Sequence, residues 1–254
     1  MPRPTRRVDW TAATSEWPVA DLQKPMTMLT FLLLSLLTTE ANATSMDRSL
    51  HPELQRYVNE RVLPAVATIP AERKESLDLL AEFVKERKAA GATADLNFIC
   101  THNSRRSHLS QLWAATAAWS FDQDHVRTYS GGTEATAFNP RAVAAVERAG
   151  FQVVKPEGKN PMYEVSFTKD HGTERCWSKK YDDAANPQKD FCAVMTCSEA
   201  DKNCPIVFGA LDRISLPYND PKEADGTPEE AARYDERCLQ IAAELWYVMQ
   251  QASK

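Results

Sequence analysis

Glycine is scarce in this chain, with 8 residues in 254, under half of the share that is usual in proteins. No hydrophobic run is long enough to cross a membrane, because the most apolar stretch, residues 28–37, falls short of the roughly 20 residues required. Basic residues are not in excess, and a net charge of −5 argues against nucleic acid or an anionic membrane as the main partner. Six cysteines are too few for a disulfide-stapled scaffold. We therefore expect a globular protein, and ask what its cysteines do.

Residues 1–45 differ in composition from the rest of the chain. The apolar run 28–37 fits the core of a signal peptide, and Ala41-Asn42-Ala43 fits a cleavage site. The basic residues before the run are scattered, whereas a signal peptide carries a positively charged segment there. The alternative is a start codon assigned too early, with translation beginning at Met26, Met28 or Met46.

The remainder divides into two parts by the spacing of its apolar residues. Residues 46–91 repeat at helical spacing, interrupted at Pro64 and Pro70, and predict two or three amphipathic helices as an N-terminal appendage. In residues 92–254, short apolar segments alternate with helical patterns, which favours a mostly parallel sheet flanked by helices. The predicted strands are 96–99, 126–129, 151–154, 191–195 and 214–216, and the predicted helices are 107–120, 139–149 and 227–251. Residues 163–167 and 175–179 look like an inserted hairpin.

The segment Cys100-Thr-His-Asn-Ser-Arg-Arg106-Ser107 lies where the first of these strands ends and a helix begins. Ligands bind at such junctions, because loop N–H groups and the positive end of a helix dipole together form an oxyanion site. Arg106 can close the loop with a planar fork for two oxygens, and Asn103 can brace it. The same field favours a thiolate, so we expect a lowered pKa at Cys100 and a nucleophilic role, with Ser107 hydrogen-bonded to its sulfur. The alternative is a buried structural cysteine beside surface arginines.

This loop resembles the phosphate loop of the low-molecular-weight protein tyrosine phosphatases and of the thioredoxin-coupled arsenate reductases that share their fold. Further matching segments follow in order: Ser130-Gly-Gly-Thr-Glu134, Asn139-Pro140, Cys197…Cys204, Asp220-Pro221 and Gly226-Thr227-Pro-Glu-Glu230. The resemblance covers the chain from about Leu96 onward and implies a three-layer α/β fold with a four-stranded sheet. It also implies an oxyanion site formed or supported by Thr101, His102, Asn103, Ser104, Arg105 and Ser107.

Asp220 matches the general acid of that family, which protonates the oxygen that leaves the substrate. From the residues alone, Asn219-Asp-Pro is equally a turn, since Asp and Pro favour turns.

Cys197 and Cys204, seven positions apart, follow a predicted buried strand. Their spacing is not that of a zinc finger, and a structural disulfide does not suit a reducing cytosol. Thiol–disulfide exchange remains, although both can also be packing residues. The resemblance implies a relay in which Cys100 attacks arsenate, Cys197 attacks the Cys100 sulfur and releases arsenite, and Cys204 forms a disulfide with Cys197. Thioredoxin would reduce that disulfide.

We therefore expect an arsenate reductase that needs no metal or cofactor, placed in the cytoplasm because its recycling requires a reducing compartment. A phosphotyrosine phosphatase is the first alternative, since it needs only Cys100, Arg106 and Asp220, with water as the second acceptor. A non-catalytic oxyanion-binding module is the other. Cys192 and Cys238 are expected to fill the core. Cys176 is expected to lie in the hairpin, and the sequence leaves open whether its side chain is exposed there.

Overall fold

The computed structural model describes residues 48–203 and 206–254. The predictions made for residues 1–45, a signal peptide or a misassigned start, lie outside the described residues. Within the described ranges, no helix combines the length and the apolar character that crossing a bilayer requires.

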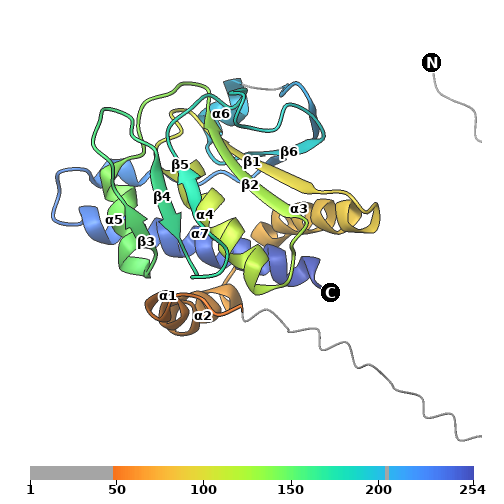
Figure 1. Ribbon diagram of the computed structural model, residues 1–254, viewed down its shortest axis with the longest axis horizontal. Helices are drawn as coiled ribbons and strands as arrows, with labels where there is room; N and C mark the ends of the chain where they lie inside the picture. Colours follow the sequence, from red (N-terminus) through yellow and green to blue (C-terminus); the bar gives the residue numbers. More distant parts are fainter. Residues whose placement is uncertain (1–47, 204–205) are drawn as a thin grey trace, which may run out of the picture. The chain divides into compact units, whose positions relative to one another are not determined.

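Four parallel strands form the central sheet (Figure 1). They are β1 (Ala94–Cys100), β2 (Val126–Gly132), β6 (Phe191–Met195) and β7 (Ala210–Ser215), in the order β2-β1-β6-β7. The fold predicted from the sequence is confirmed. All carboxyl ends of these strands lie at one edge of the sheet, which is where the predicted loop of residues 101–105 begins.

Helices flank both faces of this sheet. Along β1, Leu96 and Phe98 contribute to the large core, while Ile99 belongs to a smaller cluster on the other face. On the large-core face, α4 (Arg106–Ser120) packs on β1 and β2, and α3 (Ala71–Ala89) on β1 and β7. Helix α7 (Glu230–Ala252) packs against both helices and against α5 (Pro140–Ala149). The short α6 (Ser198–Asn203) covers β1 and β6 on the opposite face.

The predicted N-terminal helices are present as α1 (Pro52–Tyr57), a π turn (Val58–Val62), α2 (Leu63–Ala67) and α3. Pro70 directly precedes α3 and separates it from α2, whereas Pro64 lies in the first turn of α2, where a proline is tolerated. Leu54, Leu77 and Leu80 belong to the same core as the sheet residues. Side chains on the two sides of residue 91 therefore share one core. The domain boundary expected there stays a prediction.

The two ends of α5 have the capping residues that the sequence indicates. The Asn139 side chain accepts a hydrogen bond from the N–H of Arg141, Pro140 is the first helical residue, and Gly150 in the left-handed conformation follows the last. Several predicted ends differ from the structure by one to four residues, and β7 differs most, because it begins at Ala210 instead of at residue 214. β2 continues through Gly132, and α7 begins at Glu230 because residues 227–229 form a hydrogen-bonded turn.

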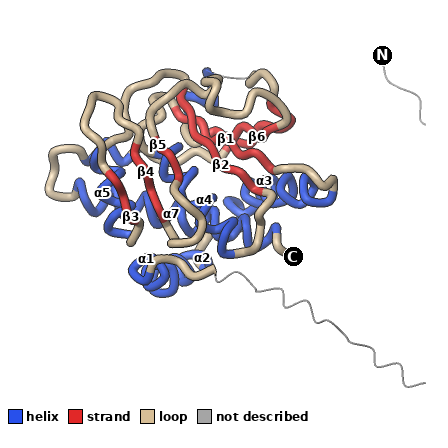
Figure 2. Tube along the Cα trace, in the orientation of Figure 1, coloured by secondary structure: helices blue, strands red, loops and turns tan. Residues whose placement is uncertain are grey.

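A second, antiparallel sheet contains β3 (Gln152–Val154), β4 (Tyr163–Ser166) and β5 (Glu174–Cys176), and Figure 2 shows it beside the parallel sheet. The expected hairpin is confirmed as β4 and β5, and the strand expected at 151–154 pairs with it instead of with the central sheet. Cys176 is fully buried, so the exposure left open for it is excluded.

The chain after β5 turns along the end of β2. The N–H of Gly132 donates to the carbonyl of Lys179, and the N–H of Tyr181 donates to the carbonyl of Gly132. A Cβ on Gly131 would lie 2.3 Å from the Cα of Tyr181, closer than atoms can approach. In a chain with so little glycine, Gly131 therefore permits this inserted segment to lie against the sheet, whereas a Cβ on Gly132 would meet the backbone of Glu134, Asn103 and Thr101.

We predict that Gly131→Ala destabilises the protein by about 1–3 kcal/mol or more, because the added methyl group displaces the backbone at Tyr181. Gly172→Ala is the control, since its new methyl group meets no atom within 4 Å and only its positive φ, +85°, opposes it. Urea unfolding followed by circular dichroism measures both. A Gly131→Ala variant as stable as the wild-type protein would contradict the packing described.

Candidate active site

Cys100 is the last residue of β1, and Arg106 is the first residue of α4. No backbone carbonyl of the described residues accepts a hydrogen bond from the N–H groups of residues 102–105. Asn103 adopts a left-handed conformation, with φ of +43°, which turns the loop tightly at its centre. Free loop amides beside a helix N-terminus are the usual setting for a bound oxyanion.

The Cys100 thiol is buried, and its Sγ lies 3.2 Å from the Oγ of Ser107. Asn103 Nδ2 donates to that same Oγ at 2.9 Å, so the Ser107 proton is free to point at the sulfur. Asn103 Oδ1 accepts from the backbone N–H of Lys179 at 2.9 Å. Both contacts expected from the sequence are present, and the inserted segment holds the asparagine that orients Ser107.

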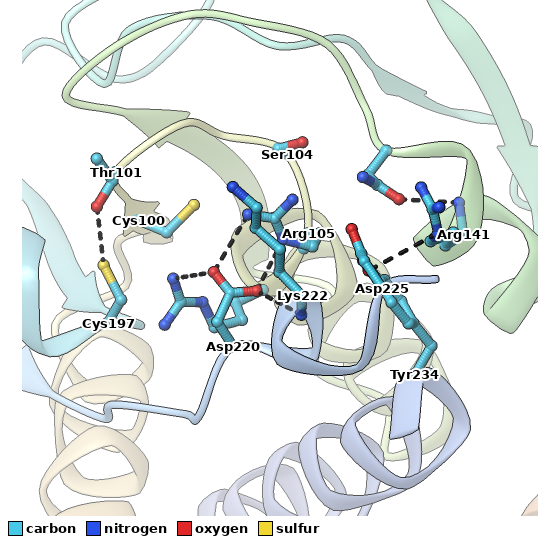
Figure 3. A network of polar contacts seen from close by, with 12 residues as sticks. Cys100, Thr101, Ser104, Arg105, Arg141, Cys197, Asp220, Lys222, Asp225 and Tyr234 are labelled. Atoms are coloured by element: carbon cyan, nitrogen blue, oxygen red, sulfur yellow. Dashed lines mark hydrogen bonds and ion pairs between the residues drawn. The ribbon is translucent and has the colours of Figure 1, made fainter. Parts of the chain in front are cut away.

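Both arginines of the loop form ion pairs with Asp220, and Figure 3 shows the Arg105 side chain beside that carboxylate. Arg105 Nε and Nη2 donate to the two carboxylate oxygens at 2.8 and 3.2 Å. Arg106 Nη2 donates to Oδ2 at 2.8 Å, while its Nη1 donates to the carbonyl of Tyr218 at 2.9 Å. Arg106 Nε is buried and has no partner among the described residues. A buried donor left unpaired is costly, so an anion within the loop would satisfy it.

The charges around Asp220 fix its ionisation. Burial raises the pKa of this carboxyl group, but Arg106 and Arg105 outweigh burial and hold the pKa below its usual value. Two guanidinium groups against one carboxylate leave one positive charge in this cluster, which suits a thiolate or an oxyanion, while Glu199, 3.4 Å from the Thr101 hydroxyl, brings a negative charge to the same cavity. A carboxylate is, however, the wrong form for a proton donor, and the general-acid role of Asp220 stays a prediction.

The remaining loop side chains divide into two groups. Thr101 faces Cys197, with its Oγ1 3.4 Å from the sulfur. Ser104 turns away and donates to the carbonyl of Ala137 at 2.7 Å. The His102 ring is exposed and lies 3.7 Å from Glu134, so its contribution to the loop is its backbone carbonyl, which accepts from the Ser178 and Thr136 hydroxyls. His102 and Ser104 therefore support the loop from outside.

Cys197 lies at the same edge of the sheet as Cys100. The register pairs Ile99 with Met195, so Cys100, the last residue of β1, and Cys197, two residues after β6, lie at the carboxyl ends of neighbouring strands. The Cys197 sulfur is buried and accepts a hydrogen bond from the N–H of Ala200, at the start of α6, at 3.3 Å. Cys204 lies outside the described residues.

The other cysteines are buried and unpaired: Cys176, Cys192 and Cys238. Burial raises the pKa of each thiol, to about 12 at Cys238. They therefore keep their protons at neutral pH, whereas a nucleophilic cysteine reacts as the thiolate. In the described part of the chain, no cluster of three or more His, Cys, Asp or Glu residues could hold a metal ion.

A cavity of about 480 Å³ opens beside Arg106 and Asp220. Its walls include Glu199, Tyr218 and Lys222. A cavity of similar size, about 490 Å³, lies near the start of β2, at the end of that strand remote from the loop.

Sequence reasoning missed Tyr218, Ser178 and Lys179, because their contributions pass through backbone groups or through an insertion that no local pattern relates to the loop. Glu199, between the two cysteines of the pair, could have been noticed.

No family model matches this chain. Among solved structures it is similar to a low-molecular-weight phosphotyrosine phosphatase from Vibrio cholerae, with a TM-score of 0.41, 11% identity and coverage of 62% of this chain and 94% of that one. It is also similar to a thioredoxin-dependent arsenate reductase from Corynebacterium glutamicum, with a TM-score of 0.36, 18% identity and coverage of 78% and 82%.

Curated sequences give a stronger relation. Arsenate reductase 2 of Staphylococcus epidermidis is 31% identical over 124 residues, which are 49% of this chain and 76% of that protein. The arsenate reductase of Bacillus licheniformis is 27% identical over 140 residues, 55% of this chain and 83% of that protein. The resemblance that the loop indicated is thereby confirmed, and the chain belongs to the arsenate reductase family.

Proposed function

We propose that this chain is an arsenate reductase that uses Cys100 as nucleophile and the pair Cys197 and Cys204 as a relay recycled by thioredoxin. The observation that carries the proposal is the position of Cys197, whose sulfur lies 3.4 Å from the hydroxyl of Thr101, the residue next to Cys100. The curated relatives bear the name of this activity. A phosphatase has no use for a second thiol at this point.

The first step joins the substrate to the loop. Arsenate binds the N–H groups of residues 102–105 and the free Nε of Arg106. The Cys100 thiolate attacks arsenic, a sulfur–arsenic bond forms, and one arsenate oxygen leaves as water after protonation. The Ser107 hydroxyl stabilises the attacking sulfur.

The second step transfers two electrons. The Cys197 thiolate attacks the Cys100 sulfur, a disulfide forms, and the electrons of the sulfur–arsenic bond remain on arsenic, which leaves as arsenite. Cys204 then attacks the Cys197 sulfur and releases Cys100 as a thiolate. Thioredoxin, a dithiol protein, reduces the Cys197–Cys204 disulfide by exchange, which places the protein in a reducing compartment such as the cytoplasm.

The second candidate is a protein tyrosine phosphatase. The observation that favours it is that Cys100, Arg106 and Asp220 lie together, since these three suffice to form and hydrolyse a phosphocysteine. The carboxylate form of Asp220 weighs against efficient ester hydrolysis at neutral pH. A non-catalytic oxyanion-binding module would show no turnover of either substrate.

We predict that Cys197→Ser abolishes thioredoxin-dependent arsenate turnover and spares hydrolysis of p-nitrophenyl phosphate, because only reduction needs a second thiol. Cys204→Ser is expected to behave the same way, and Cys100→Ser to lose both activities. Coupled oxidation of NADPH through thioredoxin reductase and thioredoxin measures the first activity, and release of p-nitrophenolate measures the second.

Cys192→Ala is the matched control, because this buried cysteine lies five positions from Cys197 and has no part in the relay. It is expected to retain arsenate turnover when folded, as checked by circular dichroism. Brisk ester hydrolysis by the wild type without arsenate turnover would overturn the reductase assignment in favour of the phosphatase.

A further prediction concerns α6, the helix between the two cysteines of the relay. Its six residues rise by about 9 Å, which is more than the Cα separation of roughly 4.4–6.8 Å that a disulfide allows. We therefore expect formation of the Cys197–Cys204 bond to unwind α6 and to break the hydrogen bonds that Arg213 and Ser215 donate to Asp201.

Hydrogen exchange measures this unwinding. The amides of residues 200–203 are expected to lose protection in the oxidised protein, while those within α4 stay protected. Unchanged protection in a sample whose Cys197–Cys204 disulfide has been verified by peptide mapping would contradict the prediction.

A further inference from the structure

The Arg105 side chain has no role in the mechanism proposed above. The steps proposed above use the side chains of Cys100 and, six positions later, Arg106, and none of them uses the side chain at the position between Ser104 and Arg106. In this chain it carries a second arginine that is buried, although a long cationic side chain is seldom buried without a partner. Its side-chain hydrogen bonds among the described residues both go to Asp220.

The two Asp220 oxygens together receive four donors. Arg105 and the backbone N–H of Lys222 donate to Oδ1, at 2.8 and 3.2 Å. Arg105 and Arg106 donate to Oδ2, at 3.2 and 2.8 Å. A carboxylate offers about four lone-pair sites, so all of them are in use. A proton on either oxygen would have to displace one of these donors.

We propose that Arg105 sets the substrate preference of the Cys100 site: by occupying both oxygens of Asp220, it withdraws this carboxyl group from leaving-group protonation and so disfavours ester hydrolysis relative to arsenate reduction. Arg105 is thus a positioning residue that acts through Asp220. The inference rests on the proposed function. It explains why a site that resembles that of a phosphatase hydrolyses esters slowly relative to its reduction of arsenate.

The chemistry of the two substrates differs at the leaving oxygen. In a phosphate ester, a sulfur–phosphorus bond forms, the ester phosphorus–oxygen bond breaks, and the leaving alkoxide or phenoxide needs a proton from outside the substrate. In arsenate, the oxygen that leaves is a hydroxyl group, and a second hydroxyl of the same anion can supply the proton that releases it as water. Loss of the external acid therefore slows ester cleavage more than arsenate attack.

The charges that face Asp220 agree with this assignment. Burial alone would raise the pKa of Asp220, and Arg106 together with Arg105 lowers it. The other titratable groups near this carboxylate come from α6, the short helix after Asp220, and α7: Glu199, Lys222, Glu223 and Tyr234. Arg106 is also held by the Tyr218 carbonyl and keeps a buried Nε that has no partner among the described residues, so Arg105 is the arginine that can be changed without removing the proposed anion site.

The test is Arg105→Gln, assayed against phenyl phosphate, p-nitrophenyl phosphate and arsenate. Without the second guanidinium, Asp220 binds a proton more readily, and the alkaline limb of the pH profile for phenyl phosphate is expected to move up by about one pH unit. At pH 7 the ratio of kcat/KM for phenyl phosphate to that for arsenate is expected to rise about tenfold. The gain for p-nitrophenyl phosphate is expected to be smaller, because its leaving group needs less protonation.

Two further variants separate this role from a structural one. Arg105→Lys keeps the charge and loses the fork, so its pH limb is expected between those of the wild type and Arg105→Gln. Adding Asp220→Asn to Arg105→Gln is expected to cancel the gain, because the proton donor is then absent.

An unchanged leaving-group dependence and pH limb in Arg105→Gln would overturn the inference. So would a parallel rise of KM for all three anions, because Arg105 would then be an oxyanion ligand. Absence of arsenate turnover in the wild type would instead overturn the proposed function, since the comparison of the two aryl phosphates does not involve arsenate.

Discussion

The Asp220 carboxylate is the point on which the site depends. Arg105 and Arg106 reach it from the start of α4, and it lies on the loop that follows β7, so one ion-pair cluster joins the loop after β1 to the loop after β7. Because this cluster fixes the Arg106 guanidinium, it also fixes which donor remains for an anion in the loop. The donor that the site offers to the proposed oxyanion and the protonation state of the carboxyl group are therefore set together.

The cysteines differ by position along the strands. Cys192 lies within β6, surrounded by the core, and its thiol keeps its proton because burial raises its pKa. Cys197 lies five residues later, beyond the strand end, where a backbone N–H of α6 faces its sulfur and Thr101 links it to the Cys100 loop. A displacement of a few residues along one strand thus separates a packing side chain from a proposed redox group.

The parallel sheet and the loop could be predicted because their signals are local: apolar strands, an Asn-Pro helix start, and a cysteine and arginine at a strand–helix junction. The partners of Arg105 could not, because Asp220 is 115 positions away in the sequence and nothing local indicates that two arginines share it. The support of Asn103 by Lys179 was missed for the same reason, since an insertion carries it. The strand at 152–154 was recognised, but its sheet was not, because pairing depends on β4 further along the chain.

The central claim is that Cys100 and Cys197 form a disulfide with each other in every reductive turnover. A single turnover of the reduced wild-type protein with arsenate, quenched at successive times, alkylated and mapped by mass spectrometry, tests it most directly. A Cys100–Cys197 disulfide should appear first, in step with arsenite, and give way to a Cys197–Cys204 disulfide with Cys100 again alkylated. Formation of arsenite while Cys197 remains a free, alkylated thiol would contradict the account.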